Sequence, residues 1–257
     1  MIEALNQLSG AGQTWLWAMF FVFLRVSAAM FMMPVFGESA VPQRVKLAVV
    51  IALSAIVMPS IEVQVPPFAG ARSFMPLGAE TIIGLSIGLA LRLFIMAVQI
   101  AGTMAAQATS LSQFFGGAGA EPQPAISQIM MVSALALAAA GHLHVRIAEL
   151  FIRSYSILPP GHFPDPADLS RWGLAQIAQS FTTAFMLAAP FMVAALIYNV
   201  AIGVINRAMP QLMVSFIGAP ALTLGGLVLL MTAAPVALQF WANGLQTFLA
   251  APFAGIP

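Results

Sequence analysis

Six apolar segments, separated by short polar or proline-rich stretches, run through the sequence. They cover about residues 15–33, 47–58, 81–106, 126–141, 181–205 and 212–241. A segment in lipid must satisfy its own backbone hydrogen bonds, so each segment is predicted to be an α-helix. The pattern therefore predicts an all-α membrane protein with about six apolar helices.

The lengths of the segments and their prolines predict that several of these helices are kinked or broken. A perpendicular span needs roughly 20 apolar residues, and the second and fourth segments are shorter than that. Pro190, Pro220 and Pro235 lie inside apolar runs, where each removes a helical hydrogen bond. Proline- and glycine-rich punctuation predicts connections at 34–42, 59–76, 110–124, 158–171 and 206–211.

Composition supports a membrane environment and excludes several classes of protein. Apolar residues make up 61% of the 257 residues and charged residues only 7%, whereas an ordinary soluble domain carries roughly 25% charged residues. The chain has no cysteine, which excludes disulfides and thiol chemistry. Its net charge of +1 gives no reason to expect binding to nucleic acid.

Two arginines, Arg25 and Arg92, interrupt apolar segments. A guanidinium in lipid costs at least a few kcal/mol, so each must face protein, water or a headgroup. One explanation places them on a substrate or ion path. The other is structural: a hydrogen bond between subunits, or a side chain near a helix end that extends to the membrane–water interface. Neither arginine has an acidic partner nearby in the sequence.

Candidate chemistry is sparse. His142 and His144 are near Glu149, but a spacing of two does not place both histidines on one helix face. A zinc site and a helix-end or interfacial pair both remain open there. No nucleophile elbow, zinc-protease motif or phosphate-binding loop is present in the sequence. We therefore expect no enzyme activity, no catalytic residues, no cofactor and no metal.

The connection at 110–124 is the most unusual stretch. It joins two long apolar segments, and glycines there permit backbone reshaping. An ordinary exposed loop and a flexible aromatic plug would both look like this. The candidate plug residues are Gln113, Phe114, Phe115, Gly116, Gly117 and Gly119. Elsewhere, Gly84 and Gly88 form a small-residue step that favours close helix packing.

Polar residues and prolines also occur in a definite order along the chain, and apolar composition alone would not produce that order. We call them landmarks. The first block holds Phe23, Arg25, Pro34, Phe36, Gly37, Pro42, Arg44 and Lys46. A second block is Gly141-His142, followed by a helix that ends in the run from Ser154 to Gly161. The third block holds Asn206, Arg207, Pro210, Gln211, Gly218 and Pro220. With these landmarks the chain resembles the FliR family of flagellar biosynthetic proteins, subunits of the type III secretion export gate.

This resemblance implies a fold and a function. It implies a FliP-like part at 1–172 fused to a FliQ-like hairpin at 173–257, with FliP-like, FliQ-like and FlhB-like subunits as partners. Unfolded exported flagellar proteins would pass through the assembly, and the loop at 110–124 would help to plug it. The implied location is the bacterial inner membrane, in the flagellar basal body, in contact with lipid. The tip of the hairpin would be cytoplasmic and both termini periplasmic.

Charge alone does not decide this topology. The first, third and fifth connections hold three basic residues, Arg44, Lys46 and Arg207. The second and fourth connections with their flanks hold four, namely Arg72, Arg146, Arg153 and Arg171. A margin of one gives no orientation by the positive-inside rule. Two alternative functions also stay open: the related subunit of a virulence injectisome, and a solute transporter that acts alone with Arg25 or Arg92 at its substrate site.

Overall fold

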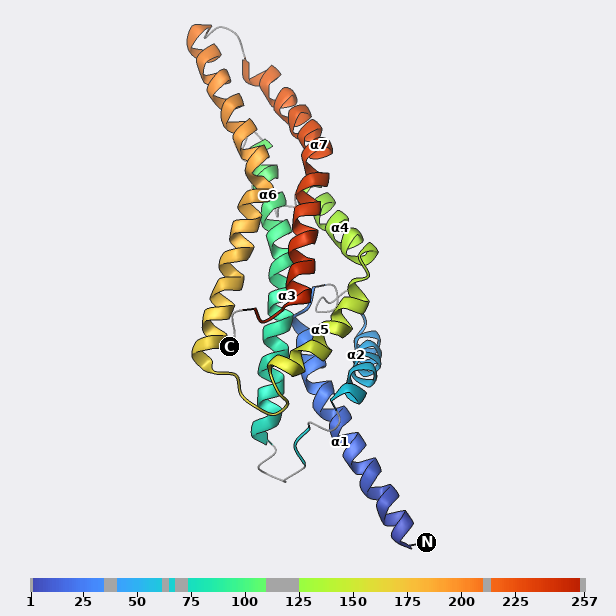
Figure 1. Ribbon diagram of the computed structural model, residues 1–257. Coiled ribbons are helices and arrows are strands. Elements are labelled where there is room, and N and C mark those ends of the chain that lie inside the picture. Colours follow the sequence, from blue (N-terminus) through green and yellow to red (C-terminus); the bar gives the residue numbers. More distant parts are fainter. Residues whose placement is uncertain are drawn as a thin grey trace. The chain divides into compact units, whose positions relative to one another are not determined.

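The computed structural model describes residues 2–34, 41–61, 65–67, 74–109, 125–209 and 214–254. Throughout this described part the regular structure is helical, as the sequence predicts (Figure 1). The α-helices are α1 (Ile2–Met32), α2 (Gln43–Val57), α3 (Phe74–Thr109), α4 (Ala125–Ala140), α5 (Leu143–Ile157), α6 (Pro166–Ala208) and α7 (Val214–Ala250). A short 3-10 helix, η1 (Met58–Ser60), continues α2.

Five of the described helices are long and apolar enough to cross a membrane, and a sixth span results if α4 and α5 count as one bent span. This agrees with the six apolar segments. Most helices extend past the predicted segments, because polar residues can continue a helix beyond its apolar part. The amphipathic helix α5 lies outside the six segments, and its end at Ile157 matches the helix expected before Pro159.

The predicted break in a helix occurs, but not at the prolines. Helix α6 is continuous through Pro190, and α7 is continuous through Pro220 and Pro235. The chain bends instead by 70° between α4 and α5. His142 adopts a left-handed conformation at this point, with φ of 56°. A left-handed residue cannot continue a right-handed helix, so it ends α4 and starts α5 in a new direction.

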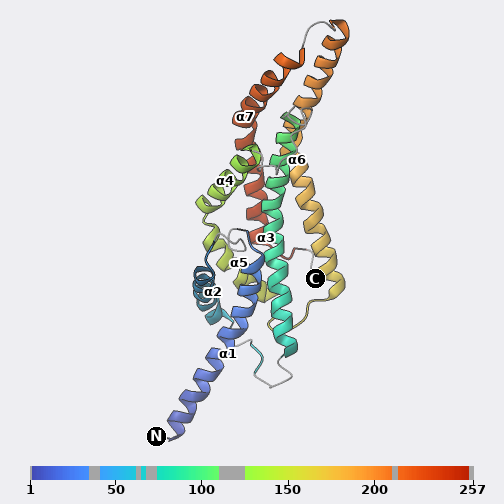
Figure 2. The same ribbon diagram turned by 180° about the vertical axis from the view of Figure 1, so that it is seen from behind.

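The described chain forms two compact units. The first unit contains residues 1–93, 142–177 and 247–257. In it, α1 packs against α2, and α2 packs against α5 (Figure 1 and Figure 2). The end of the chain is held by Trp172, whose indole Nε1 donates to the Pro252 carbonyl at 3.0 Å.

Helices α1 and α3 approach closely within the first unit, because glycines line their contact. A Cβ atom at Gly84 would lie 2.2 Å from the Arg25 carbonyl oxygen, and one at Gly88 would lie 2.3 Å from the Ala29 oxygen. Real atoms cannot approach so closely, so any side chain at either position would push the helices apart. The small-residue step predicted from the sequence is therefore a packing surface.

The second unit contains residues 94–141 and 178–246. Here too a glycine allows close packing, since a Cβ at Gly102 of α3 would lie 2.5 Å from the Ser127 Cα of α4. Helix α7 is tied to α3 by Trp241, whose indole Nε1 donates to the Phe94 carbonyl at 2.8 Å. Helices α6 and α7 are joined by the Tyr198 hydroxyl, which donates to the Gly218 carbonyl.

Candidate functional site

The side chain of Arg25 lies fully buried in the first unit and forms an ion pair with Glu80. Arg25 comes from α1 and Glu80 from α3. The guanidinium Nε donates to Glu80 Oε2 at 2.7 Å, and Nη2 donates to Oε1 at 3.1 Å. This two-bond arrangement matches the planar guanidinium to the planar carboxylate, and it is the strong form of such a pair.

The remaining surface of the guanidinium is covered by α5 and the turn that follows it. Nη1 donates to Ser154 Oγ at 3.0 Å, and Nη2 donates to the Leu158 carbonyl at 3.1 Å. The Tyr155 ring stacks against the charge, with the Arg25 Cζ 3.6 Å from the ring centroid. An aromatic face attracts a cation, most strongly where water is excluded.

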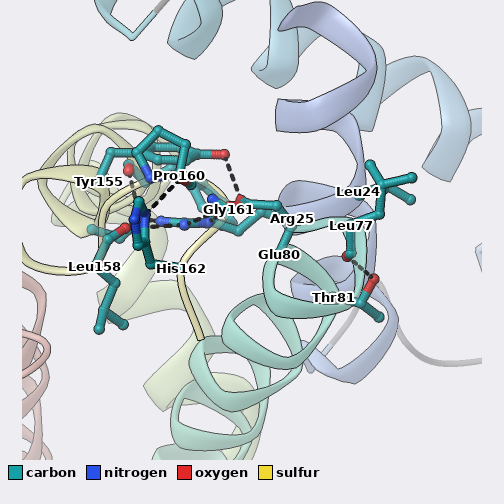
Figure 3. Close-up of polar contacts among 12 residues, drawn as sticks. Leu24, Arg25, Leu77, Glu80, Thr81, Tyr155, Leu158, Pro160, Gly161 and His162 are labelled. Atoms are coloured by element: carbon teal, nitrogen blue, oxygen red, sulfur yellow. Dashed lines mark hydrogen bonds and ion pairs between the residues drawn. The ribbon is translucent and has the colours of Figure 1, made fainter. Parts of the chain in front are cut away.

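Glu80 is also held from several directions. The Tyr155 hydroxyl donates to Oε2 at 3.2 Å, and the Gly161 backbone N–H donates to Oε1 at 2.9 Å. Gly161 has a positive φ of 77°, and an added Cβ would lie 3.0 Å from Pro66 Cγ. Figure 3 shows Arg25 and Glu80 pointing toward Tyr155 and the turn at Leu158–Gly161. We call these residues the Arg25 cluster: Arg25, Glu80, Ser154, Tyr155, Leu158 and Gly161.

The Arg25 cluster is electrically neutral and saturated with hydrogen bonds. No buried side-chain nitrogen or oxygen in the described part of the chain lacks a partner. A buried charge is tolerated only when it is paired and fully hydrogen-bonded in this way. The cluster therefore joins α1, α3 and the end of α5 within one chain. The alternatives considered for Arg25 were a substrate or ion path, a hydrogen bond between subunits, or a reach to the membrane surface. Its fully buried guanidinium instead forms an ion pair within the chain.

Arg92 and Arg207 are placed very differently. Arg92 is exposed near the middle of α3, and Arg207 is exposed in the last turn of α6. Neither belongs to the Arg25 cluster. A cation in the last turn of a helix is favoured by the helix dipole, which explains the position of Arg207.

The two histidines do not form a metal centre within the described residues. Their rings are 6.2 Å apart at the bend between α4 and α5. No group of three or more possible protein ligands was found in the part of the chain that the structure describes. His142 stands at the start of α5, so the helix-end interpretation is the one that its position supports.

Comparison with known proteins places this architecture in a family. Residues 16–248, nearly the whole chain, match the model of the bacterial export proteins, family 1. The chain belongs to this family.

Individual relatives agree. A protein of Caulobacter vibrioides named flagellar biosynthetic protein FliR is 29% identical over 250 residues, which cover 95% of this chain and 98% of the relative. A protein of Escherichia coli with the same name is 28% identical, over 88% of each chain. A third, from Aquifex aeolicus, is also 28% identical over 88% of each chain. The resemblance to the FliR family is confirmed.

Two landmark blocks of this export protein meet in the Arg25 cluster. Arg25 belongs to the first block, and the run from Ser154 to Gly161 belongs to the second. They are 129 residues apart at the Arg25–Ser154 hydrogen bond. These separate stretches of sequence thus form one structural feature of the first unit.

The other landmarks have local roles or lie outside the described residues. Pro42 precedes α2, and its carbonyl accepts the first helical hydrogen bonds, from the Val45 and Lys46 amides. Gly218 accepts the Tyr198 hydroxyl, and a Cβ there would lie 2.8 Å from that oxygen. Exposed or half-buried landmarks are Pro34, Arg44 and Asn206. Pro220 lies within α7, while Phe36, Gly37, Pro210, Gln211 and the candidate plug residues 113–119 lie outside the described residues.

Glu80 is the functional residue that the sequence pattern missed. The predicted connection ends at Pro76 and the predicted third segment starts at Thr81, so Glu80 falls in neither. In fact α3 begins at Phe74, and Glu80 lies inside the helix. A lone carboxylate beside an apolar run indicates a cationic partner, but the sequence does not distinguish Arg25 from Arg92 as that partner.

Proposed function

We propose that this chain is a structural and gating subunit of the flagellar type III protein export gate. The carrying observation is the family match over residues 16–248, together with relatives named flagellar biosynthetic protein FliR. Helices that can cross a membrane account for most of the same residues. The conducted substrates in this proposal are unfolded flagellar subunits, and the chain supplies shape and closure instead of catalysis.

The partners in this proposal are FliP-like, FliQ-like and FlhB-like subunits in the bacterial inner membrane. Support comes from the hairpin of α6 and α7, because little of its apolar surface is buried within the chain. Only 22% of the most apolar window of each helix is buried inside the chain. The remaining apolar surface must contact lipid or other subunits. We assign residues 1–172 to a FliP-like part and 173–257 to a FliQ-like hairpin, a boundary that falls within α6.

Co-purification from native membranes tests this assignment. We expect the chain to be recovered with the FliP-like and FliQ-like subunits after mild solubilisation. The physical reason is the exposed apolar surface of α6 and α7, which needs a cover outside the bilayer. Recovery as a stable lone monomer would contradict the proposal and favour a transporter that acts alone.

The gating part of the proposal rests on the glycine-rich segment between α3 and α4. Its glycines permit backbone reshaping, and it joins two apolar helices. Deletion of residues 114–119 is expected to open a leak, measured as ion flux across the inner membrane of cells that carry the variant. As a control, the variant chain must still co-purify with its partner subunits, which shows that the assembly is intact. An intact assembly without a leak would refute the plug assignment.

A further inference from the structure

Arg92 occupies an unusual position for a charge. It lies near the centre of the apolar run from Thr81 to Ala106 in α3. At 1.5 Å per residue, the ends of that run are about 17 and 21 Å away along the helix. A helix is about 10–12 Å wide with its side chains included, so a side chain reaches only a few ångströms from the backbone. Arg92 therefore cannot reach lipid headgroups from an α3 that crosses the bilayer.

The surface around Arg92 is apolar. Leu89, one turn earlier, is 44% exposed, and Ile82, two turns before Leu89, is 40% exposed. Water would not favour such a surface, so the exposed side of this helix is built for lipid or protein. A lone guanidinium in lipid costs several kcal/mol.

The four carboxylates whose contacts the structure describes are engaged elsewhere. Glu80 is bound to Arg25, and Asp168 accepts from Arg171 at 2.6 Å. Glu149 is 3.9 Å from Arg153. Asp165 accepts from the backbone amides of Ala167 and Asp168 at the start of α6.

We propose that the exposed face of α3 around Arg92 is a contact surface for another membrane-embedded subunit, which presents a carboxylate to Arg92. The guanidinium offers five donors in a planar fork that fits a carboxylate with two hydrogen bonds. The apolar neighbours Leu89 and Ile82 would pack against the apolar part of the same partner helix. This inference rests on the proposed function, because it requires that the chain works in an assembly.

The test compares variants of Arg92 in the assembly purified from native membranes. Arg92→Gln and Arg92→Leu are expected to lower retention of the contacting subunit roughly tenfold or more, because the partner carboxylate is left buried and unpaired. Arg92→Lys is expected to restore part of the binding, since it keeps the charge but loses the fork. Arg171→Gln is the matched control, because Arg171 is an exposed arginine whose ion pair with Asp168 lies within α6.

The outcomes separate this inference from the proposed function. Failure of the wild-type chain to bring down any partner would refute the proposed function itself. Full retention of all partners by Arg92→Leu would refute the inference alone. A loss of stability of the isolated Arg92→Gln chain would point to a partner within the same chain, and would also refute it.

Cross-linking locates the partner directly. The chain has no cysteine, so Leu89→Cys provides a single attachment point for a photoactivatable maleimide. We expect a covalent adduct with one other subunit, and the adduct should depend on Arg92. Adducts with lipid only would show that this face contacts the bilayer and would overturn the inference.

Discussion

Arg25 and Glu80 are held together so completely that each depends on the other. Both side chains have no exposed surface. Removing two charges from water costs several kcal/mol per ion, and only good geometry with additional hydrogen bonds offsets that cost. The serine, the tyrosine, the Leu158 carbonyl and the Gly161 amide supply those bonds. The pair adds little net stability, but losing one partner is costly.

Glu80→Gln should destabilise the chain by about 3–5 kcal/mol, because the Arg25 charge remains buried without its counter-charge. The measurement is the free energy of unfolding of the purified chain in detergent, with the amount of chain in membranes as a second readout. Glu149→Gln is the matched control, since Glu149 forms an exposed pair worth about 0–1 kcal/mol. The double variant Arg25→Met with Glu80→Met should lose less stability than Glu80→Gln. Equal stability of Glu80→Gln and Glu149→Gln would contradict this account.

At the scale of the helices, glycine determines how closely two helices can approach each other. The adjacent glycines Gly225 and Gly226 of α7 illustrate the difference that position makes. A Cβ at Gly226 would lie 2.6 Å from Thr109 Cγ2, whereas a Cβ at Gly225 meets nothing within 4 Å. Thr109 cannot easily move aside, because its hydroxyl is bonded to the Ala105 carbonyl of its own helix. Only Gly226 is therefore needed for the close packing of α7 against Thr109, although the two glycines are neighbours in sequence.

Gly226→Ala is expected to destabilise the second unit by about 1–3 kcal/mol through overlap with Thr109. Gly225→Ala is expected to stabilise α7 by up to about 1 kcal/mol, because alanine is the better helix former. Thermal denaturation of both purified variants gives the comparison. If the two substitutions shift the melting temperature in the same direction and by the same amount, the close contact is not present in the native protein.

At the scale of the molecule, topology decides which surfaces meet which compartment. The proposed orientation places the turn after α6 in the cytoplasm and both termini in the periplasm. Asn206, near the end of α6, and Ala251, directly after α7, are both exposed. Because the chain lacks cysteine, a single cysteine at either position is a clean probe.

Ala251→Cys is expected to react with a membrane-impermeant maleimide in spheroplasts, whereas Asn206→Cys should react only after lysis. The reason is that the charged reagent cannot cross the apolar core of the bilayer. Mass shift on a gel gives the readout, and export activity of each variant confirms a working chain. The reverse labelling pattern would invert the proposed topology.

The sequence by itself determined the class, the family and the approximate positions of the helices. Few charges and long apolar runs leave only helices as spanning elements, because backbone groups must be satisfied without water. The family landmarks were also local enough to read directly from the sequence. Helix ends were not determined by the sequence alone, since polar residues such as Glu80 continue α3 without any change in backbone geometry.

Tertiary structure alone decided the partners of the polar residues. Arg25 meets Glu80 across 55 residues and Ser154 across 129, and no local spacing encodes such contacts. It also placed the sharp bend at His142 and left Pro190 within a continuous α6. A proline loses one backbone bond, which neighbouring packing in an apolar environment can compensate. Which charge is buried and which is left exposed, as Arg25 and Arg92 show, depends on helices that only folding brings together.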